Sequence, residues 1–258
     1  MTTRWLGLLA FCLVSGLTGC PATVPRPADG PTTPEPVLAR LRERGEAISS
    51  LSGLLSIEAW RGDERVRARQ LIMVQRPDRL RVDTLTPFDQ PVSMMASDGL
   101  TVSIYSLEGR RYHQGKATPE NLSRLLQLPL TGHELTALLS GGIPLLSYTE
   151  AHLDWDDGRG AYLLRLSAGT RRQDIWVESG LFRVLELLTY EGGTLVFSAR
   201  FGDYSDRGPR AVPRRLRFEV PGRKLRVDAV LVDHALDVSP PEGAFQIPLP
   251  RGIEVEPL

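Results

Sequence analysis

The chain has 258 residues and no net charge, because 31 lysines and arginines balance 31 aspartates and glutamates. This length is enough for one domain with a substantial core. A neutral chain lacks the general electrostatic attraction on which nucleic-acid binding depends, so we expect no nucleic-acid partner. Its two cysteines, Cys12 and Cys20, both lie near the N-terminus, and we expect no disulfide, metal ligand or thiol nucleophile in the rest of the chain.

A short apolar run behind Arg4 ends in the sequence Leu17-Thr18-Gly19-Cys20. Arg4 and the apolar residues 6–14 are typical of a signal peptide, and the last four residues resemble the lipobox of bacterial lipoproteins. We therefore expect that residues 1–19 are removed and that Cys20 is acylated. An ordinary secretory signal and an N-terminal membrane helix are the alternatives, although the run is short for a bilayer span.

Residues 20–36 follow as a proline-rich segment that holds six prolines between Pro21 and Pro36. This composition favours extended, solvated backbone with a rise of about 3.1 Å per residue. We expect a tether that reaches roughly 50 Å from the lipid.

Helical and strand patterns alternate in the remaining chain. Val37, Leu38 and Leu41 recur at helical spacing and predict an amphipathic helix. Short alternating runs bounded by turn residues predict strands over residues 55–113 and again over residues 153–232. Two short helices are expected between these groups, one over residues 121–128 and one over residues 135–139.

This pattern predicts a mainly β fold of the α+β class. So many short antiparallel strands require a strongly curved sheet, and we expect an open or half barrel of about 11 strands whose concave face is covered by the few helices. We expect one domain over residues 37–258.

The sequence lacks a recognisable catalytic signature. The segment 109–116 has neither the glycine spacing of a phosphate loop nor the Ser or Thr that should follow Lys116. Asp154, Asp156 and Asp157 fit a hairpin turn better than a metal or acid–base site. The four histidines are scattered, which argues against zinc. We therefore expect no enzyme, no metal and no cofactor.

Five segments follow one another in a recognisable order: Leu51-Ser52-Gly53 with Trp60, then residues 79–88, Leu128-Pro129-Leu130, residues 138–144, and residues 212–216. This order resembles the LolA and LolB superfamily of periplasmic lipoprotein carriers over most of residues 37–250. It is closer to LolB, which is itself a lipoprotein. Phe88-Asp89 stands where the LolB pattern has Leu-Gly, the proline-rich segment is unusual and tryptophan is sparser than in LolB, so a diverged relative with another cargo is an alternative.

The resemblance implies a binding function without a cofactor. It implies an apolar cavity that receives the acyl chains of lipoproteins from a LolA-like periplasmic carrier and releases them into the outer membrane. The protein would be a monomer, lipid-anchored to the outer membrane and facing the periplasm. The inner membrane is the alternative location. Six apolar residues are candidates for the cavity wall, with ordinary core packing as the alternative for each: Met73, Met94, Leu122, Leu126, Leu135 and Leu139.

The loop of residues 86–91 holds Phe88 between Pro87 and Pro91. The LolB resemblance places a protruding apolar residue here, so Pro87 and Phe88 are expected to engage the membrane during delivery. The alternative is that Phe88 caps the end of the barrel.

Other functions are open on the same fold, because a fold does not determine a function. The chain could sense lipids or lipoproteins, bind a protein partner in the envelope, or serve as a structural assembly factor.

Overall fold

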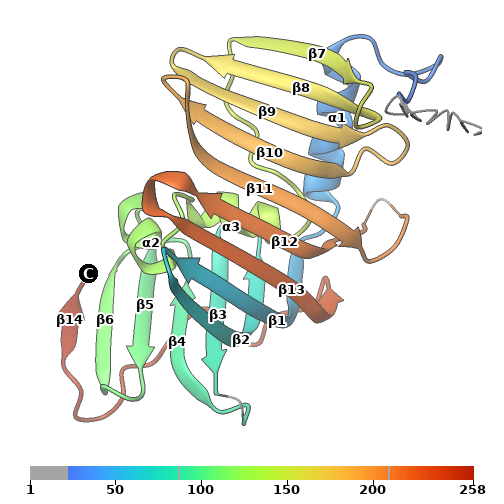
Figure 1. Ribbon diagram of the computed structural model, residues 1–258. Helices are drawn as coiled ribbons and strands as arrows, with labels where there is room; N and C mark the ends of the chain where they lie inside the picture. Colours follow the sequence, from blue (N-terminus) through green and yellow to red (C-terminus); the bar gives the residue numbers. More distant parts are fainter. Residues whose placement is uncertain (1–22, 87, 209) are drawn as a thin grey trace, which may run out of the picture.

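The computed structural model describes residues 23–86, 88–208 and 210–258, so the predicted signal peptide, Cys20 and Pro87 lie outside the described residues. A sheet of fourteen strands runs through the described chain (Figure 1). Its strands are β1 (Ser50–Arg61), β2 (Glu64–Gln75), β3 (Arg79–Leu85), β4 (Pro91–Ser97), β5 (Thr101–Ser106), β6 (Arg111–Lys116), β7 (Glu150–Asp156), β8 (Ala161–Ala168), β9 (Arg171–Glu178), β10 (Val184–Glu191), β11 (Thr194–Tyr204), β12 (Pro213–Val220), β13 (Leu225–Leu236) and β14 (Val255–Pro257).

The sheet consists of two meanders joined in its middle. Strands β1 to β6 form one meander and strands β7 to β13 form the other. The first strand, β1, pairs antiparallel with β13 and joins them. The last strand, β14, pairs parallel with β6 and forms one edge of the sheet, while β7 forms the other.

Three α-helices accompany the sheet: α1 (Pro34–Glu46), α2 (Pro119–Leu126) and α3 (Gly132–Leu139). A 3-10 turn, η1, covers Pro221–Arg223. Proline in the first turn suits α1 and α2, because the missing N–H has no partner there in any helix. A capping box between Thr131 and Glu134 starts α3, with the two backbone N–H groups held at 2.7 and 3.1 Å.

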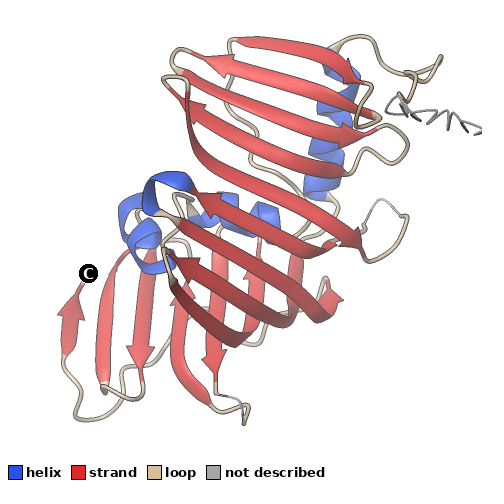
Figure 2. Cartoon of the chain, viewed as in Figure 1, coloured by secondary structure: helices blue, strands red, loops and turns tan. Residues whose placement is uncertain are grey.

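The main core lies between the concave face of the sheet and the helices. Figure 2 shows the helices gathered along one face of the strongly twisted sheet. Leu38 of α1, Leu122 of α2 and Leu138 of α3 are buried in the same cluster as Leu51 of β1 and Leu164 of β8. The two meanders therefore share one core.

The fold class is confirmed, but the strand count is higher than the predicted value of about 11. Fourteen strands are present in the described chain. Short runs joined by short turns each form a separate strand, and β14 adds a strand that the pattern did not predict. Pro257 lies in β14. Proline is rare in strands except at a sheet edge such as this, because it has no N–H to donate to a neighbouring strand.

A C-terminal segment crosses the convex face of the sheet near β4, β5 and β6. The hydroxyl of Tyr112 donates to the carbonyl oxygen of Ile247 at 2.8 Å. Ala96, Tyr112 and Ile247 form a second buried cluster, against which Met94 packs. This face of β4 is therefore separate from the main core.

Residues 23–33, which we call the N-terminal strap, pack on the domain instead of forming the free tether that composition predicted. The backbone N–H of Val24 donates to the carbonyl oxygen of Asp157 at 2.9 Å. The guanidinium of Arg26 lies 5.7 Å from the ring centroid of the buried Tyr162. The helix α1 then begins at Pro34. Most residues of the strap are exposed, but these contacts hold it against the domain.

None of the helices in the described residues is long and apolar enough to cross a membrane.

Candidate functional site

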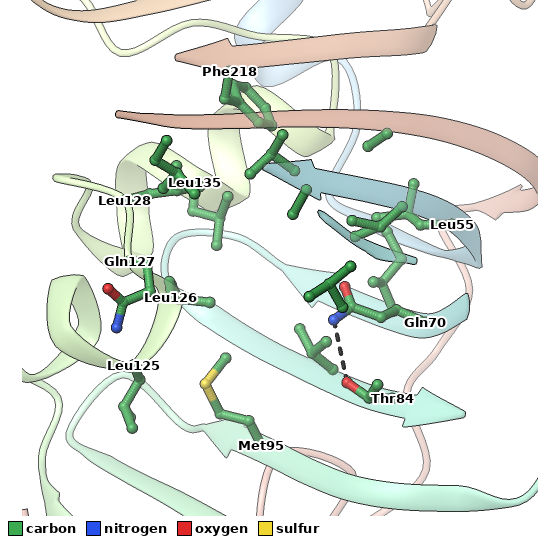
Figure 3. Close-up of a pocket in the computed structure, with 18 of the residues that line it drawn as sticks. Leu55, Gln70, Thr84, Met95, Leu125, Leu126, Gln127, Leu128, Leu135 and Phe218 are labelled. Carbon is green, nitrogen blue, oxygen red and sulfur yellow. Dashed lines mark hydrogen bonds between the residues drawn. The ribbon is translucent and has the colours of Figure 1, made fainter. Parts of the chain in front are cut away.

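An apolar pocket of about 470 Å³ lies between the concave face of the sheet and helices α2 and α3. Figure 3 shows Leu125 and Leu126 of α2 and Leu135 of α3 on one side and residues of the strands on the other. Apolar side chains dominate the wall: Leu55, Ile57 and Ala59 of β1, Ile72 of β2, Val82 of β3, Met95 of β4, Ile104 of β5, Leu126 of α2, Leu135 and Leu139 of α3, Phe218 of β12, and Leu225, Val227 and Ala229 of β13.

Strand alternation places these side chains on one face. In β1, Leu55, Ile57 and Ala59 line the pocket, whereas Glu58 between them is held on the other face by Arg67 at 2.9 Å. Successive side chains of a strand point to opposite faces, so a period of two in the sequence produces one apolar wall and one charged surface.

The helix α2 covers the pocket and is held at both ends. At its start, the side chain of Thr118 accepts a hydrogen bond from the backbone N–H of Asn121 at 3.3 Å. At its end, Gln127 adopts a left-handed backbone conformation with φ of +63° and stops the helix. Arg223 donates to the carbonyl oxygen of Gln127 at 2.9 Å, and Arg61 donates to the side-chain oxygen of Gln127.

Polar groups are few in the wall. The amide Nε2 of Gln70 donates to the hydroxyl of Thr84 at 3.2 Å (Figure 3), so these two side chains are partners of one another. Among the described residues that line the pocket, only Arg61 and Glu64 are charged. These two residues flank the turn between β1 and β2. Such a wall suits an alkyl chain.

The structure brings three of the six predicted cavity residues into this wall. Leu126, Leu135 and Leu139 line the pocket. Leu122, also on α2, is only 2 % exposed and belongs to the main core rather than to the wall. Sequence periodicity identified the inward face of both helices but not which inward residue borders empty space.

Met73 and Met94 do not line the pocket. Each lies one position from a residue on the concave face, since Ile72 and Met95 line the pocket. Met94 packs instead against the cluster beneath the C-terminal segment, where Arg81 approaches its sulfur at 3.6 Å. Because Met94 and Met95 are adjacent, the sequence did not show which of them faces the concave side of the sheet. The other strand residues of the pocket wall were missed because alternation shows which side chains share a face, not whether that face borders a cavity.

The loop between β3 and β4 presents Phe88 to solvent, with 87 % of the residue exposed. The hydroxyl of Thr86 accepts hydrogen bonds from the backbone N–H groups of Phe88 and Gln90, both at 3.2 Å. Asp89 has a φ of +60°, which tightens this turn. Phe88 therefore does not cap the barrel end. Pro87, the other residue predicted to engage the membrane, lies outside the described residues.

In the part of the chain that the structure describes, no group of three or more His, Cys, Asp or Glu side chains is arranged to hold a metal ion. The acidic residues of the β7–β8 hairpin have other partners: Arg165 donates to Asp154 at 2.6 Å, and Trp176 donates to Asp156 at 2.8 Å.

Residues 64–134 match a family described as "Predicted periplasmic protein (DUF2092)". The matched segment begins at β2 and ends in the first turn of α3, so it includes α2 and four of the strands in the pocket wall. No curated protein matches the sequence of this chain.

Several solved structures share the fold at low sequence identity. A DUF1329 family protein from Desulfovibrio piger has a TM-score of 0.58 and 13 % identity, over 82 % of this chain and 97 % of that one. A LolA superfamily protein from Nitrosomonas europaea has a TM-score of 0.55 and 15 % identity, over 84 % and 99 %. A putative outer membrane lipoprotein-sorting protein domain from Vibrio parahaemolyticus has a TM-score of 0.53 and 11 % identity, over 81 % and 94 %. The curved sheet of this chain, with its helices over an apolar pocket, thus has the fold of LolA-superfamily proteins.

Proposed function

We propose that this chain is a lipid-anchored protein of the bacterial envelope that binds the acyl chains of lipoproteins in the pocket between the sheet and α2 and α3, and helps to insert them into the outer membrane. The observation that carries the proposal is the apolar wall, whose two charged residues, Arg61 and Glu64, lie at a strand turn. The proposed role is binding, without a catalytic step or a cofactor.

The energetics of acyl chains explain why such a wall is useful. Each methylene that leaves water contributes about 0.8 kcal/mol, so an acylated protein needs its chains shielded while it crosses an aqueous compartment. A pocket of about 470 Å³ is within the usual range for small-molecule sites. Its wall provides apolar contact surface and few fixed polar contacts. One site can therefore accept acyl chains of different length and then release them.

The anchor in this proposal is Cys20, behind the lipobox-like Leu17-Thr18-Gly19. The periplasmic description of the family that matches residues 64–134, and the lipoprotein-sorting name of the Vibrio parahaemolyticus domain, support a place in the periplasm and a LolA-like carrier as the donor. We expect Cys20→Ser to release the folded domain from membranes on cell fractionation, because the lipid is its attachment. Membrane association that resists a salt wash in this variant would contradict the anchor.

The exposed Phe88 is the proposed contact with the receiving membrane. Its 87 % exposure leaves the ring free to enter the interfacial region of a bilayer.

Acyl binding is tested by purifying the unlipidated variant Cys20→Ala from cells and extracting bound lipid. We expect fatty-acyl lipid to co-purify with it, and to be lost from a second variant, Leu126→Trp, in which the indole fills the pocket. The matched control is Leu100→Trp, since Leu100 is 81 % exposed and lies outside the wall. Absence of lipid from the folded Cys20→Ala protein would favour a protein-binding or structural role.

Carriage and sensing are separated by depleting the protein in its own cells. A carrier should leave outer-membrane lipoproteins stranded in the inner membrane or periplasm. A sensor should leave their localisation intact while it alters an envelope response.

A further inference from the structure

A second recess, of about 210 Å³, lies between α1 and two turns of the sheet. The helix contributes Arg40, Glu43 and Arg44, and Arg207 faces them from the loop between β11 and β12. Three of these four charged side chains are positive. The floor between β9 and β10 is formed by Gly180, Leu181 and Phe182.

Arg44 is buried without a direct ion pair among the described residues. Arg44 is only 8 % exposed, and its Nη2 donates to the carbonyl oxygen of Ala211 at 3.0 Å. Within the described residues, no carboxylate oxygen lies within 4.0 Å of its guanidinium: Glu43 pairs with Arg40 at 2.8 Å, Glu178 pairs with Arg183 at 2.6 Å, and the charge of Asp206 acts from a longer distance.

Buried charges in proteins are normally paired, so a buried arginine that shares a recess with two further arginines suits an anionic ligand. Burial is the main cause that lowers the pKa of Arg44, while the charges of Asp206 and Glu178 act in the opposite direction. The ring of Tyr204 lies 5.9 Å from its guanidinium and offers a weaker cation–π contact.

The N-terminal strap places this recess close to the membrane anchor. The strap packs on Tyr162 through Arg26, and Tyr162 stacks on Phe182 of the recess with ring centroids 6.2 Å apart. Figure 1 shows the strap at the same end of the sheet as the turns β7–β8, β9–β10 and β11–β12. Val24 is fixed to the β7–β8 turn, and the four residue steps back to Cys20 span at most about 14 Å.

We propose that the recess binds the phosphate of an anionic phospholipid headgroup in the membrane that holds the anchor. The planar guanidinium of Arg44 can donate two hydrogen bonds to one phosphate, and Arg40 and Arg207 supply further positive charge at its mouth. Leu181, 37 % exposed beside it, would contact the apolar edge of the same lipid. The inference uses the proposed lipid anchor for its orientation and does not depend on acyl carriage.

The test uses the chain from residue 20 onward with Cys20→Ser, so that no anchor contributes to binding. Sedimentation with vesicles of phosphatidylcholine, with and without phosphatidylglycerol, gives the affinity. We compare this protein with Arg44→Gln and with the double variant Arg40→Gln/Arg207→Gln, which changes side chains at the mouth of the recess. The matched control is Arg42→Gln, an exposed arginine of the same helix that lies outside the recess and approaches Tyr148 at 3.5 Å.

We expect phosphatidylglycerol vesicles to bind about tenfold more weakly to Arg44→Gln and to the double variant, and within twofold of the parent to Arg42→Gln. A fluorescent fatty-acyl probe should bind all four proteins equally, so failure here is distinct from failure of acyl binding. Equal vesicle affinity for Arg42→Gln and the double variant would overturn the proposal. The same affinity of the parent protein for vesicles with and without phosphatidylglycerol would also overturn it. Protection of the fold by inorganic phosphate without vesicle binding would assign the recess to free phosphate and also overturn it. If Arg44→Gln fails to fold, the double variant decides.

Discussion

The indole N–H of Trp155 donates to the carbonyl oxygen of Val24 at 2.8 Å, across 131 positions of the chain. This bond fixes the N-terminal strap to β7, the edge strand of the second meander. The N-terminal strap therefore has a fixed position on the sheet from Val24 onward. The β3–β4 loop that carries Phe88 lies in the other half of the sheet (Figure 1).

Close packing of the strap on Tyr162 predicts a rescue experiment. A Cβ added at Gly30 would lie 2.1 Å from the hydroxyl oxygen of Tyr162. We expect Gly30→Ala to lower the free energy of unfolding by about 1–3 kcal/mol. Tyr162→Phe removes that oxygen, which has no hydrogen-bond partner among the described residues, and should restore part of the loss in the double variant.

Thermal unfolding of the four proteins measures this coupling. Gly202→Ala is the control, because an added Cβ there meets nothing within 4 Å. Additive effects of the two substitutions would show that the strap does not rest on Tyr162. With the strap released, residues 20–33 could extend roughly 43 Å as polyproline-like chain, so lipoprotein delivery should survive Gly30→Ala.

Because Phe88 is exposed, we expect its substitution to impair lipoprotein delivery without lowering the stability of the fold. Phe88→Glu should leave the free energy of unfolding within about 0.5 kcal/mol, since surface substitutions rarely do more. It should slow lipoprotein transfer to liposomes, because a carboxylate does not enter the bilayer interface. Leu100→Glu, at another exposed apolar residue, is the control that should transfer normally. A Phe88→Glu protein with the normal transfer rate contradicts the membrane contact.

The buried carboxylate of Glu186 predicts a specific acid sensitivity. Arg159 and Arg200 each donate to it at 2.6 Å. Burial alone would raise the pKa of Glu186, but these two hydrogen bonds and their charges hold it below its usual value. A carboxyl with a lower pKa in the folded state stabilises the fold above its unfolded pKa of about 4.3, and this stability is lost as the pH falls through the folded value.

We therefore expect Glu186→Gln to lower the Tm at neutral pH, and the difference from the parent to shrink as the pH falls from about 6 to about 3. Glu254→Gln, at an exposed C-terminal position, is the control, and its Tm should equal that of the parent at every pH. A Tm difference for Glu186→Gln that does not change with pH would assign its effect to packing.

Local patterns predicted much of the fold. The helix of Val37, Leu38 and Leu41, the helical island before residue 140 and the alternating strands all follow from period and turn residues. The C-terminal strand β14 did not, because it is short, contains Pro257 and depends on pairing with β6 far away in the sequence. The attachment of the strap was missed for a related reason: composition predicts a free tether, and its bond to Trp155 joins residues 131 positions apart in the sequence.

The pocket was predictable only in part. Helical period identified Leu126, Leu135 and Leu139, but the choice between Met94 and Met95 depends on the register of β4 against its neighbours. In that register Met95 pairs with Val82 and Ile104, which line the pocket, and Met94 pairs with Asp83 and Tyr105 on the other face. A shift by one residue exchanges the two faces, and sequence alternation alone does not exclude it.

These two methionines provide the most direct test of acyl binding in the pocket. A fluorescent fatty-acyl probe is titrated into the Cys20→Ser protein and its variants Met95→Trp and Met94→Trp, with the Tm recorded for each. We expect Met95→Trp to weaken probe binding at least tenfold, because its indole would fill the pocket, and Met94→Trp to bind like the parent, because its side chain lies on the opposite face. Equal affinity of both folded variants, or stronger loss in Met94→Trp, would contradict the account.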